Sequence, residues 1–122
     1  MLLEKLREKK QNSFGPFDFE ALYPLFRESI IQRFEYTIEL TWKYCKKLLE
    51  QKDISVEYNA PVPVIRTAYA SGLLQEDIAE TLLRAIKDRN RTSHIYKEAV
   101  AEELIAHIPL YAATIKKIIQ LN

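Results

Sequence analysis

Apolar residues recur every three or four positions along most of this chain, and no useful stretch alternates apolar with polar residues. The first spacing is typical of one face of an α-helix, whereas alternation would indicate a half-buried strand. Short connections separate the helical patterns. We therefore predict an all-α protein, folded as an antiparallel up-and-down bundle of four to five helices.

The longest apolar stripe predicts a helix from about Leu25 to Gln51. Its inward positions step by three or four residues, and they are Phe26, Ile30, Phe34, Ile38, Thr41, Cys45 and Leu48, widened by Ile31, Trp42 and Leu49. A short charged helix over Leu2–Lys10 and a single turn over Asp18–Pro24 are expected before it. The long helix is thus the main framework of the predicted bundle.

Three further helices follow a connection over Lys52–Pro63. Val64–Ser71 forms a short helix that stops at Gly72, because glycine accepts the left-handed backbone of a helix end. The next helix runs from about Gln75 to Arg91, and the last covers roughly Lys97–Leu121. In the last helix the inward positions are predicted to be Val100, Leu104, Ile108, Ile115 and Ile119, and Pro109 is expected to kink or divide it.

Composition narrows the class of protein. The 122 residues, 48% apolar and 29% charged, suit one folded domain over 1–122 and exclude disorder. A net charge of +1 creates no global field for nucleic acid, so any basic site is local. A single cysteine, no apolar run of membrane length and no signal peptide predict a cytoplasmic protein without a membrane segment.

The local basic site lies between Arg84 and Lys97, where five basic residues accompany one acid, Asp88. On a continuous helix Asn90 and His94 share a face, while Arg89 and His94 are well apart in angle. Arg89, His94 and Tyr96 converge only if the helix ends near Arg91 and the chain turns at Thr92–Ser93. Two interpretations remain: an anion site at a helix junction, or a solvated basic helix end, which composition alone favours.

Other candidate residues have simpler explanations. His107 has no charged neighbour that forms a set with it, so it is predicted to be a structural or surface histidine. Cys45 lies on the apolar stripe and is expected in the core. Glu35 and Glu39 are expected to pair with Arg33, Lys43 or an arginine of a later helix. Two histidines and one cysteine match no metal-ligand spacing, so no metal and no cofactor are predicted.

Three segments, in the right order, resemble the HEPN-domain family, in its nucleotidyltransferase substrate-binding branch. The first two are Ile31–Lys43, similar to the long-helix signature, and Val64–Leu73, similar to the short helix with its glycine stop. The third is Arg89-Asn90-Arg91-Thr92-Ser93-His94-Ile95-Tyr96, which matches the family's Arg-Asn, His and Tyr motif. The sequence departs from the family in a shorter N-terminal helix and in Lys97, where relatives commonly carry Asp.

The resemblance implies a homodimer in which Arg89 and His94 of both chains line a shared cleft. It implies a metal-independent ribonuclease toxin, with His94 as general acid or base and Arg89 on the scissile phosphate. The predicted binding residues beside them are Lys87, Asn90 and Arg91. Tyr96 is the expected acceptor of AMP from a partner, a minimal (MNT-type) nucleotidyltransferase, and this addition would silence the toxin.

Two alternatives to a ribonuclease remain open. One is a non-catalytic subunit that presents a nucleotide or another substrate to the nucleotidyltransferase. The other is a purely structural helical adaptor, which the resemblance disfavours. The first alternative shares its residues and its partner with the ribonuclease, so only activity separates the two.

Overall fold

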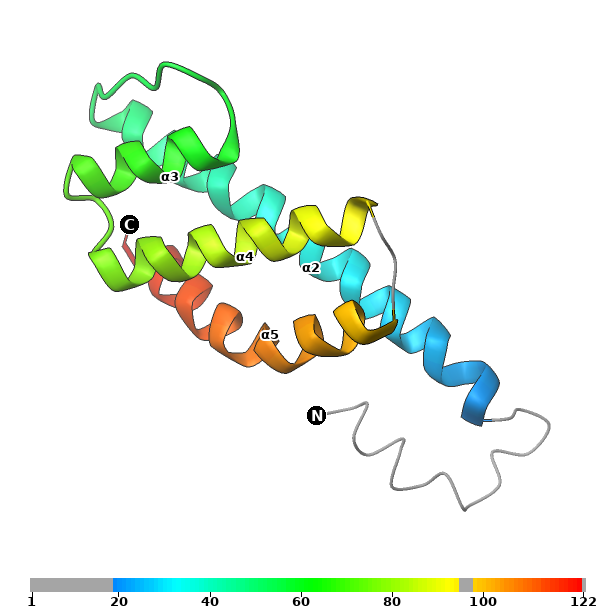
Figure 1. The fold of residues 1–122 in the computed structure, drawn as a ribbon. Coiled ribbons are helices and arrows are strands. Elements are labelled where there is room, and N and C mark those ends of the chain that lie inside the picture. Colours follow the sequence, from blue (N-terminus) through cyan, green and yellow to red (C-terminus); the bar gives the residue numbers. More distant parts are fainter. Residues whose placement is uncertain (1–18, 95–97, 122) are drawn as a thin grey trace.

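The computed structural model describes residues 19–94 and 98–121. They form four helices that pack together: α2 (Phe19–Gln51), α3 (Pro61–Ala70), α4 (Glu76–His94) and α5 (Glu98–Ile119) (Figure 1). The predicted all-α bundle is confirmed over this part of the chain. The predicted helix over Leu2–Lys10, together with Asp18, Tyr96 and Lys97, lies outside the described residues.

Helix α2 contacts each of the other three described helices, and α4 runs opposite to both α2 and α5 (Figure 1). It begins at Phe19, earlier than predicted, and carries Pro24 inside its second turn. Tertiary contacts support this early start: the Tyr23 hydroxyl donates to Glu102 Oε1 at 2.5 Å, and Arg27 pairs with the same carboxylate at 3.8 Å. The proline lies close enough to the helix start for these contacts to outweigh its missing donor.

Helix α3 begins at Pro61, three residues before the predicted start. Both Pro61 and Pro63 fall in the first turn, where the backbone N–H groups have no partner within the helix, so the prolines cost little there. The predicted stop is confirmed. Gly72 has φ of +82°, a left-handed conformation, and its N–H donates to the Tyr69 carbonyl.

Helix α5 is continuous through Pro109, so the proline does not divide it, although the ribbon curves along its length (Figure 1). Leu104 is buried as predicted. Beyond the proline the buried positions are Tyr111, Thr114 and Ile118, whereas Ile119 is 60% exposed, so its predicted inward orientation was wrong. Two adjacent isoleucines fitted the apolar pattern equally well, and packing against α2 selects Ile118.

The core lies between α2 and the other three helices. Its largest fully buried side chains come from all four described helices, and they include Ile38, Leu49, Ile65, Leu82, Ile86 and Ile118. Cys45 is also fully buried, as predicted, and burial raises the pKa of its thiol to about 11. No helix within the described ranges is long and apolar enough to cross a membrane.

Candidate functional site

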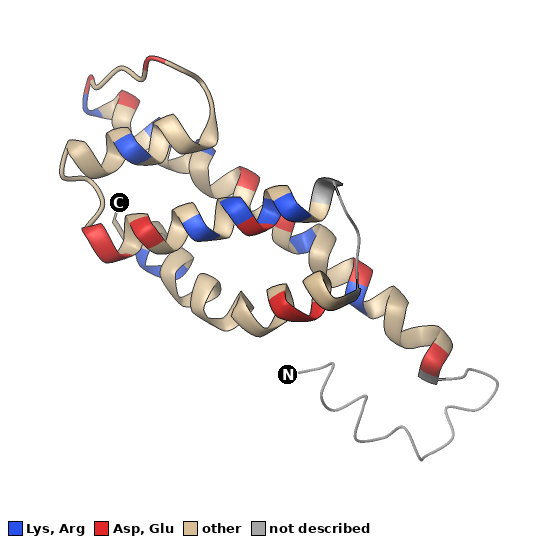
Figure 2. Ribbon diagram, viewed as in Figure 1, with Lys and Arg blue, Asp and Glu red and all other residues tan. Residues whose placement is uncertain are grey.

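The second half of α4 carries most of the predicted site. Lysine and arginine positions colour much of this stretch of the ribbon, and α4 packs against both α2 and α5 (Figure 2). Lys87, Asn90 and Arg91 are exposed, and Arg89 is half-buried. His94 is the last residue of α4, and its side chain, like all of Tyr96, lies outside what the structure describes.

The course of α4 bears on how Arg89 and His94 can meet. The helix continues to His94 instead of ending near Arg91, which was the condition for their convergence. Five residues along a regular helix correspond to a rotation of about 140° between the two backbone positions. The fold therefore does not place Arg89 and His94 on one face of α4.

The face of α4 toward α2 places Arg89 beside a carboxylate. Arg89 Nη2 lies 3.7 Å from Glu39 Oε2, which is a long ion pair. Glu39 also accepts a hydrogen bond from Trp42 Nε1 at 3.0 Å and pairs with Lys43 Nζ at 3.3 Å. These contacts, the Trp42 hydrogen bond first, hold the pKa of Glu39 below its usual value, so the carboxylate is charged. The predicted pairing of Glu39 with Lys43 and an arginine of a later helix is confirmed.

The guanidinium of Arg89 is only partly used in this contact. Its Nε atom is buried and has no hydrogen-bond partner among the described residues. A buried donor without an acceptor is costly, and such atoms commonly mark a site that a ligand or water completes. Arg89 thus retains donors for an anion that Glu39 does not satisfy.

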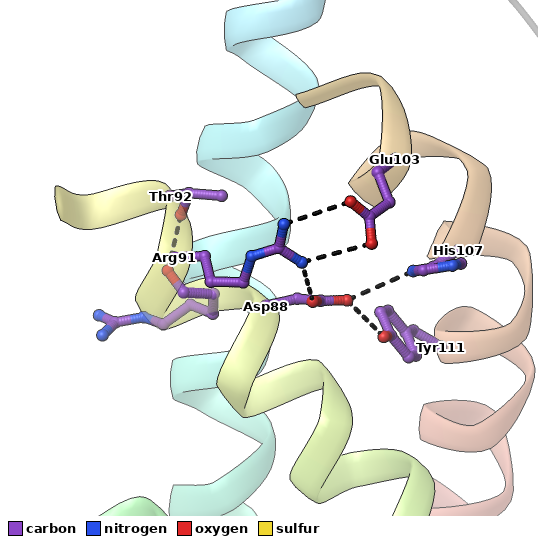
Figure 3. Close-up of polar contacts among 7 residues, drawn as sticks. Asp88, Arg91, Thr92, Glu103, His107 and Tyr111 are labelled. Atoms are coloured by element: carbon purple, nitrogen blue, oxygen red, sulfur yellow. Dashed lines mark hydrogen bonds and ion pairs between the residues drawn. The ribbon is translucent and has the colours of Figure 1, made fainter. Parts of the chain in front are cut away.

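The face of α4 toward α5 contains a second cluster, centred on Asp88 (Figure 3). Asp88 Oδ2 accepts a hydrogen bond from the Tyr111 hydroxyl at 2.5 Å and lies 3.4 Å from His107 Nδ1. Asp88 Oδ1 lies 3.3 Å from Arg91 Nη1. The two terminal nitrogens of Arg91 also reach the two oxygens of Glu103, at 3.4 and 3.2 Å. This cluster ties α4 to α5 by matched charges.

Burial and charge make the Asp88 cluster largely self-contained. The Asp88 side chain is only 13% exposed. The pKa of Tyr111 is raised, first by burial and then by its hydrogen bond to Asp88. Both terminal nitrogens of Arg91 are engaged by Glu103 and Asp88, and these contacts, Glu103 first, raise the pKa of the guanidinium. The binding role of Arg91 stays a prediction, and its guanidinium is paired with carboxylates of the same chain.

His107 is the residue that sequence reasoning misjudged. It is exposed, as predicted for a surface histidine, but the expectation that no charged neighbour forms a set with it was wrong, since it faces Asp88. The signal was present in the spacing: Glu103, His107 and Tyr111 are four residues apart and share one face of α5. What was missing was the pairing of that face with α4.

An apolar groove lies between α2 and α5. One hollow of about 220 Å³ is bounded by Phe34, Ile108 and Ile115, and the neighbouring one, of about 370 Å³, by Leu40, Ile118 and Ile119. Three large apolar side chains beside or within this groove are more than a third exposed: Tyr36, Leu40 and Ile119. The described residues hold no cluster of three or more His, Cys, Asp or Glu side chains suited to a metal ion.

Comparison with known proteins places this chain in a family. Residues 1–121 match the family model described as "nucleotidyltransferase substrate binding protein like". The chain belongs to this family. The HEPN-type resemblance drawn from the Arg89–Tyr96 motif and the two upstream segments is therefore confirmed.

A solved structure is similar to this chain in both sequence and fold. A crystal structure of a protein from Thermus thermophilus is 33% identical and superposes with a TM-score of 0.73, covering 98% of this chain and 95% of the other. None of the curated proteins searched matches the chain. The family is thus established over residues 1–121, and the fold over the residues that the structure describes.

Proposed function

We propose that this protein is the HEPN partner of a minimal nucleotidyltransferase and is itself a metal-independent ribonuclease toxin. The observation that carries the proposal is the incomplete pairing of Arg89, the arginine of the motif. This arginine is half-buried, and it keeps a donor without a partner among the described residues. A guanidinium in this state is suited to a phosphate, whose oxygens accept paired N–H bonds.

The proposed reaction is cleavage of RNA at a phosphodiester. His94 takes the proton of a ribose 2′-hydroxyl, the 2′ oxygen attacks phosphorus, and the 5′ oxygen leaves with a proton from a second imidazole. Arg89 holds the phosphate and stabilises the charge that develops on it. Lys87 and Asn90 bind the RNA beside the scissile bond, and Arg91, whose terminal nitrogens contact Asp88 and Glu103, adds positive charge there. The products are a 2′,3′-cyclic phosphate end and a free 5′-hydroxyl end.

A homodimer would supply the second imidazole. Arg89 and His94 lie about 140° apart on α4, so we propose that two chains together complete the site across a twofold axis. Exposed Tyr36, Leu40 and Ile119 along α2 and α5 provide apolar surface for such an association. The same proposal places the protein in the cytoplasm, where its nucleotidyltransferase partner and RNA are found.

The second candidate function is a non-catalytic subunit that binds a nucleotide or another substrate for the nucleotidyltransferase. The description of the family favours it directly, because it names substrate binding and no cleavage. This candidate uses the same Arg89 as an anchor for a nucleotide phosphate. It predicts binding of nucleotide without turnover of RNA.

One experiment separates the two candidates. The purified protein is incubated with a structured RNA in EDTA, beside His94→Ala and Arg89→Ala variants whose helix content is checked by circular dichroism. A ribonuclease cleaves in EDTA, and each substitution abolishes cleavage. Cleavage that survives His94→Ala, or that needs a divalent ion, contradicts the mechanism, and no cleavage by the wild type favours the binding subunit.

We further propose that AMP addition to Tyr96 silences the toxin. A phenol with its ordinary pKa of about 10 is a weak nucleophile, so the partner must supply metal and base. Intact-mass spectra after co-expression with the nucleotidyltransferase measure the addition, and Tyr96→Phe is the matched variant. Equal addition to both proteins, or to neither, would contradict this regulation.

A further inference from the structure

Glu39 stands where an anion would be expected to bind. Its carboxylate is surrounded by an indole N–H, an ammonium and a guanidinium, from Trp42, Lys43 and Arg89. Such a set of donors is what proteins use to hold a phosphate. In this chain the anion that these donors surround is the carboxylate of Glu39, a side chain of α2.

The three contacts of the Glu39 carboxylate differ in length, and the longest is the one that a ligand could most easily replace. Trp42 and Lys43 lie on α2 with Glu39, three and four residues further along, at 3.0 and 3.3 Å. Arg89 reaches across from α4 at 3.7 Å, and its buried Nε remains without a partner among the described residues. The carboxylate therefore pairs closely with the donors of its own helix and only weakly with Arg89.

The Glu39 side chain is also accessible from solvent. It is 34% exposed, and Lys43, at 57%, is more exposed still, while the Lys43 ammonium lies 5.8 Å from the centre of the Trp42 ring. A part-exposed ion pair of this kind contributes roughly 0–1 kcal/mol to stability. A phosphate that offers two oxygens to Arg89 and a third to Lys43 can compete with it.

We propose that Trp42, Lys43 and Arg89 form a phosphate-binding subsite, and that Glu39 occupies it until the phosphate group of an RNA or a nucleotide displaces the carboxylate. This inference deepens the proposed function by adding Trp42 and Lys43 as ligand donors and Glu39 as a resident competitor. It rests on the proposed function only for the source of the phosphate.

Trp42 gives a direct measurement, because it is the only tryptophan in the chain and its indole N–H is bonded to the carboxylate that must leave. Its fluorescence is followed during titration with inorganic phosphate, with AMP and with a short 2′-O-methyl RNA that cannot be cleaved. Chloride at equal ionic strength is the salt control. We expect a saturable change with each phosphate probe and none with chloride.

Two substitutions test the roles of the residues. Glu39→Gln removes the competitor and should tighten phosphate binding roughly three- to five-fold, the size expected from one part-exposed ion pair. Lys43→Met removes a donor and should weaken it by a similar factor. Lys46→Met is the matched control, since Lys46 is on the same helix but pairs with Glu50, at 3.7 Å.

Each outcome decides the inference. Unchanged or weaker phosphate binding in Glu39→Gln would mean that Glu39 positions Arg89 instead of competing with phosphate, and would overturn it. Equal losses in Lys43→Met and Lys46→Met, or no saturable signal from the wild type and Glu39→Gln, would overturn it too. If Glu39→Gln does not fold, the two lysine variants decide. Binding needs no cleavage, so a missing ribonuclease activity leaves this test standing.

Discussion

The two faces of α4 near its C-terminal end differ in how completely their polar groups are paired. Toward α5, Asp88 receives Tyr111 and Arg91 and faces His107, and Arg91 is held again by Glu103. Toward α2, Arg89 has one long ion pair and an unpartnered buried nitrogen within the described residues. Two arginines, two residues apart, thus have different surroundings.

This difference distinguishes charged side chains that hold helices together from charged side chains that can bind a ligand. A cluster in which each acceptor has a donor holds two helices together, and a ligand that bound there would have to break those bonds. A part-filled cluster is less stable than it could be, and natural proteins tolerate such a shortfall at sites that bind something. We therefore expect the α5-facing cluster to matter most for stability and the α2-facing cluster for binding.

The largest expected effect on stability comes from the α5-facing cluster. Asp88→Ala leaves the Tyr111 hydroxyl without its acceptor and removes one of the two acceptors of Arg91 Nη1, at a site where the Asp88 side chain is 13% exposed. We expect the free energy of unfolding to fall by about 2–3 kcal/mol. Urea unfolding followed by circular dichroism measures it.

Arg89→Gln is the corresponding substitution in the α2-facing cluster. It removes only a long, part-exposed ion pair, so the expected loss is below about 1 kcal/mol. Losses of equal size in Asp88→Ala and Arg89→Gln would show that the two faces do not differ as described.

A smaller effect is expected from the Tyr111 hydroxyl alone. Tyr111→Phe removes the hydrogen bond to Asp88 but keeps the ring, whose centre lies 5.8 Å from that of Phe34. The expected loss is about 1–1.5 kcal/mol. Tyr58→Phe, at a 63% exposed position, is the control and should leave stability unchanged.

The pH dependence of stability gives a second test of the hydrogen bond between Tyr111 and Asp88. The pKa of Tyr111 is raised in the folded protein, so above about pH 10 the unfolded chain loses this proton first. The folded state then binds more protons than the unfolded state, and stability falls as pH rises. Unfolding free energies at about pH 8 and about pH 10.5 should therefore differ more in the wild type than in Tyr111→Phe. An identical decline in both would contradict the raised pKa.

The smallest expected effect concerns Cys45, which belongs to neither face. Its thiol is fully buried and its pKa is raised to about 11, so the native protein should not react with a disulfide reagent at neutral pH. In denaturant one thiol per chain should react. Rapid labelling of the native protein would mean that the core around Cys45 opens readily.

Much of the fold followed from the sequence because helical periodicity survives in each segment. The long stripe of α2 and the stop at Gly72 were predicted from spacing and from the backbone freedom of glycine. The starts of α2 and α3 were misplaced, since the prolines there were taken as boundaries although each lies in the first turns of its helix. Where apolar residues were adjacent, as at Ile118 and Ile119, only packing could choose.

The candidate site was predictable only in part. The motif located Arg89 and the surrounding basic residues, because their order along the chain is itself the signal. The partners of each arginine were not predictable, since Glu39, Glu103 and Tyr111 come from other helices and their register against α4 is set by core packing. The same limit explains why no charged neighbour was expected to form a set with His107.

The length of α2 has a consequence for how the molecule unfolds. At 33 residues the helix is about 50 Å long and contacts each of the other three described helices. No pair of those helices can separate from the rest without exposing apolar surface of α2, so partial opening is penalised wherever it begins. Heat or denaturant should therefore dismantle this bundle in a single cooperative step, and a chain cut inside α2 would lose the whole fold.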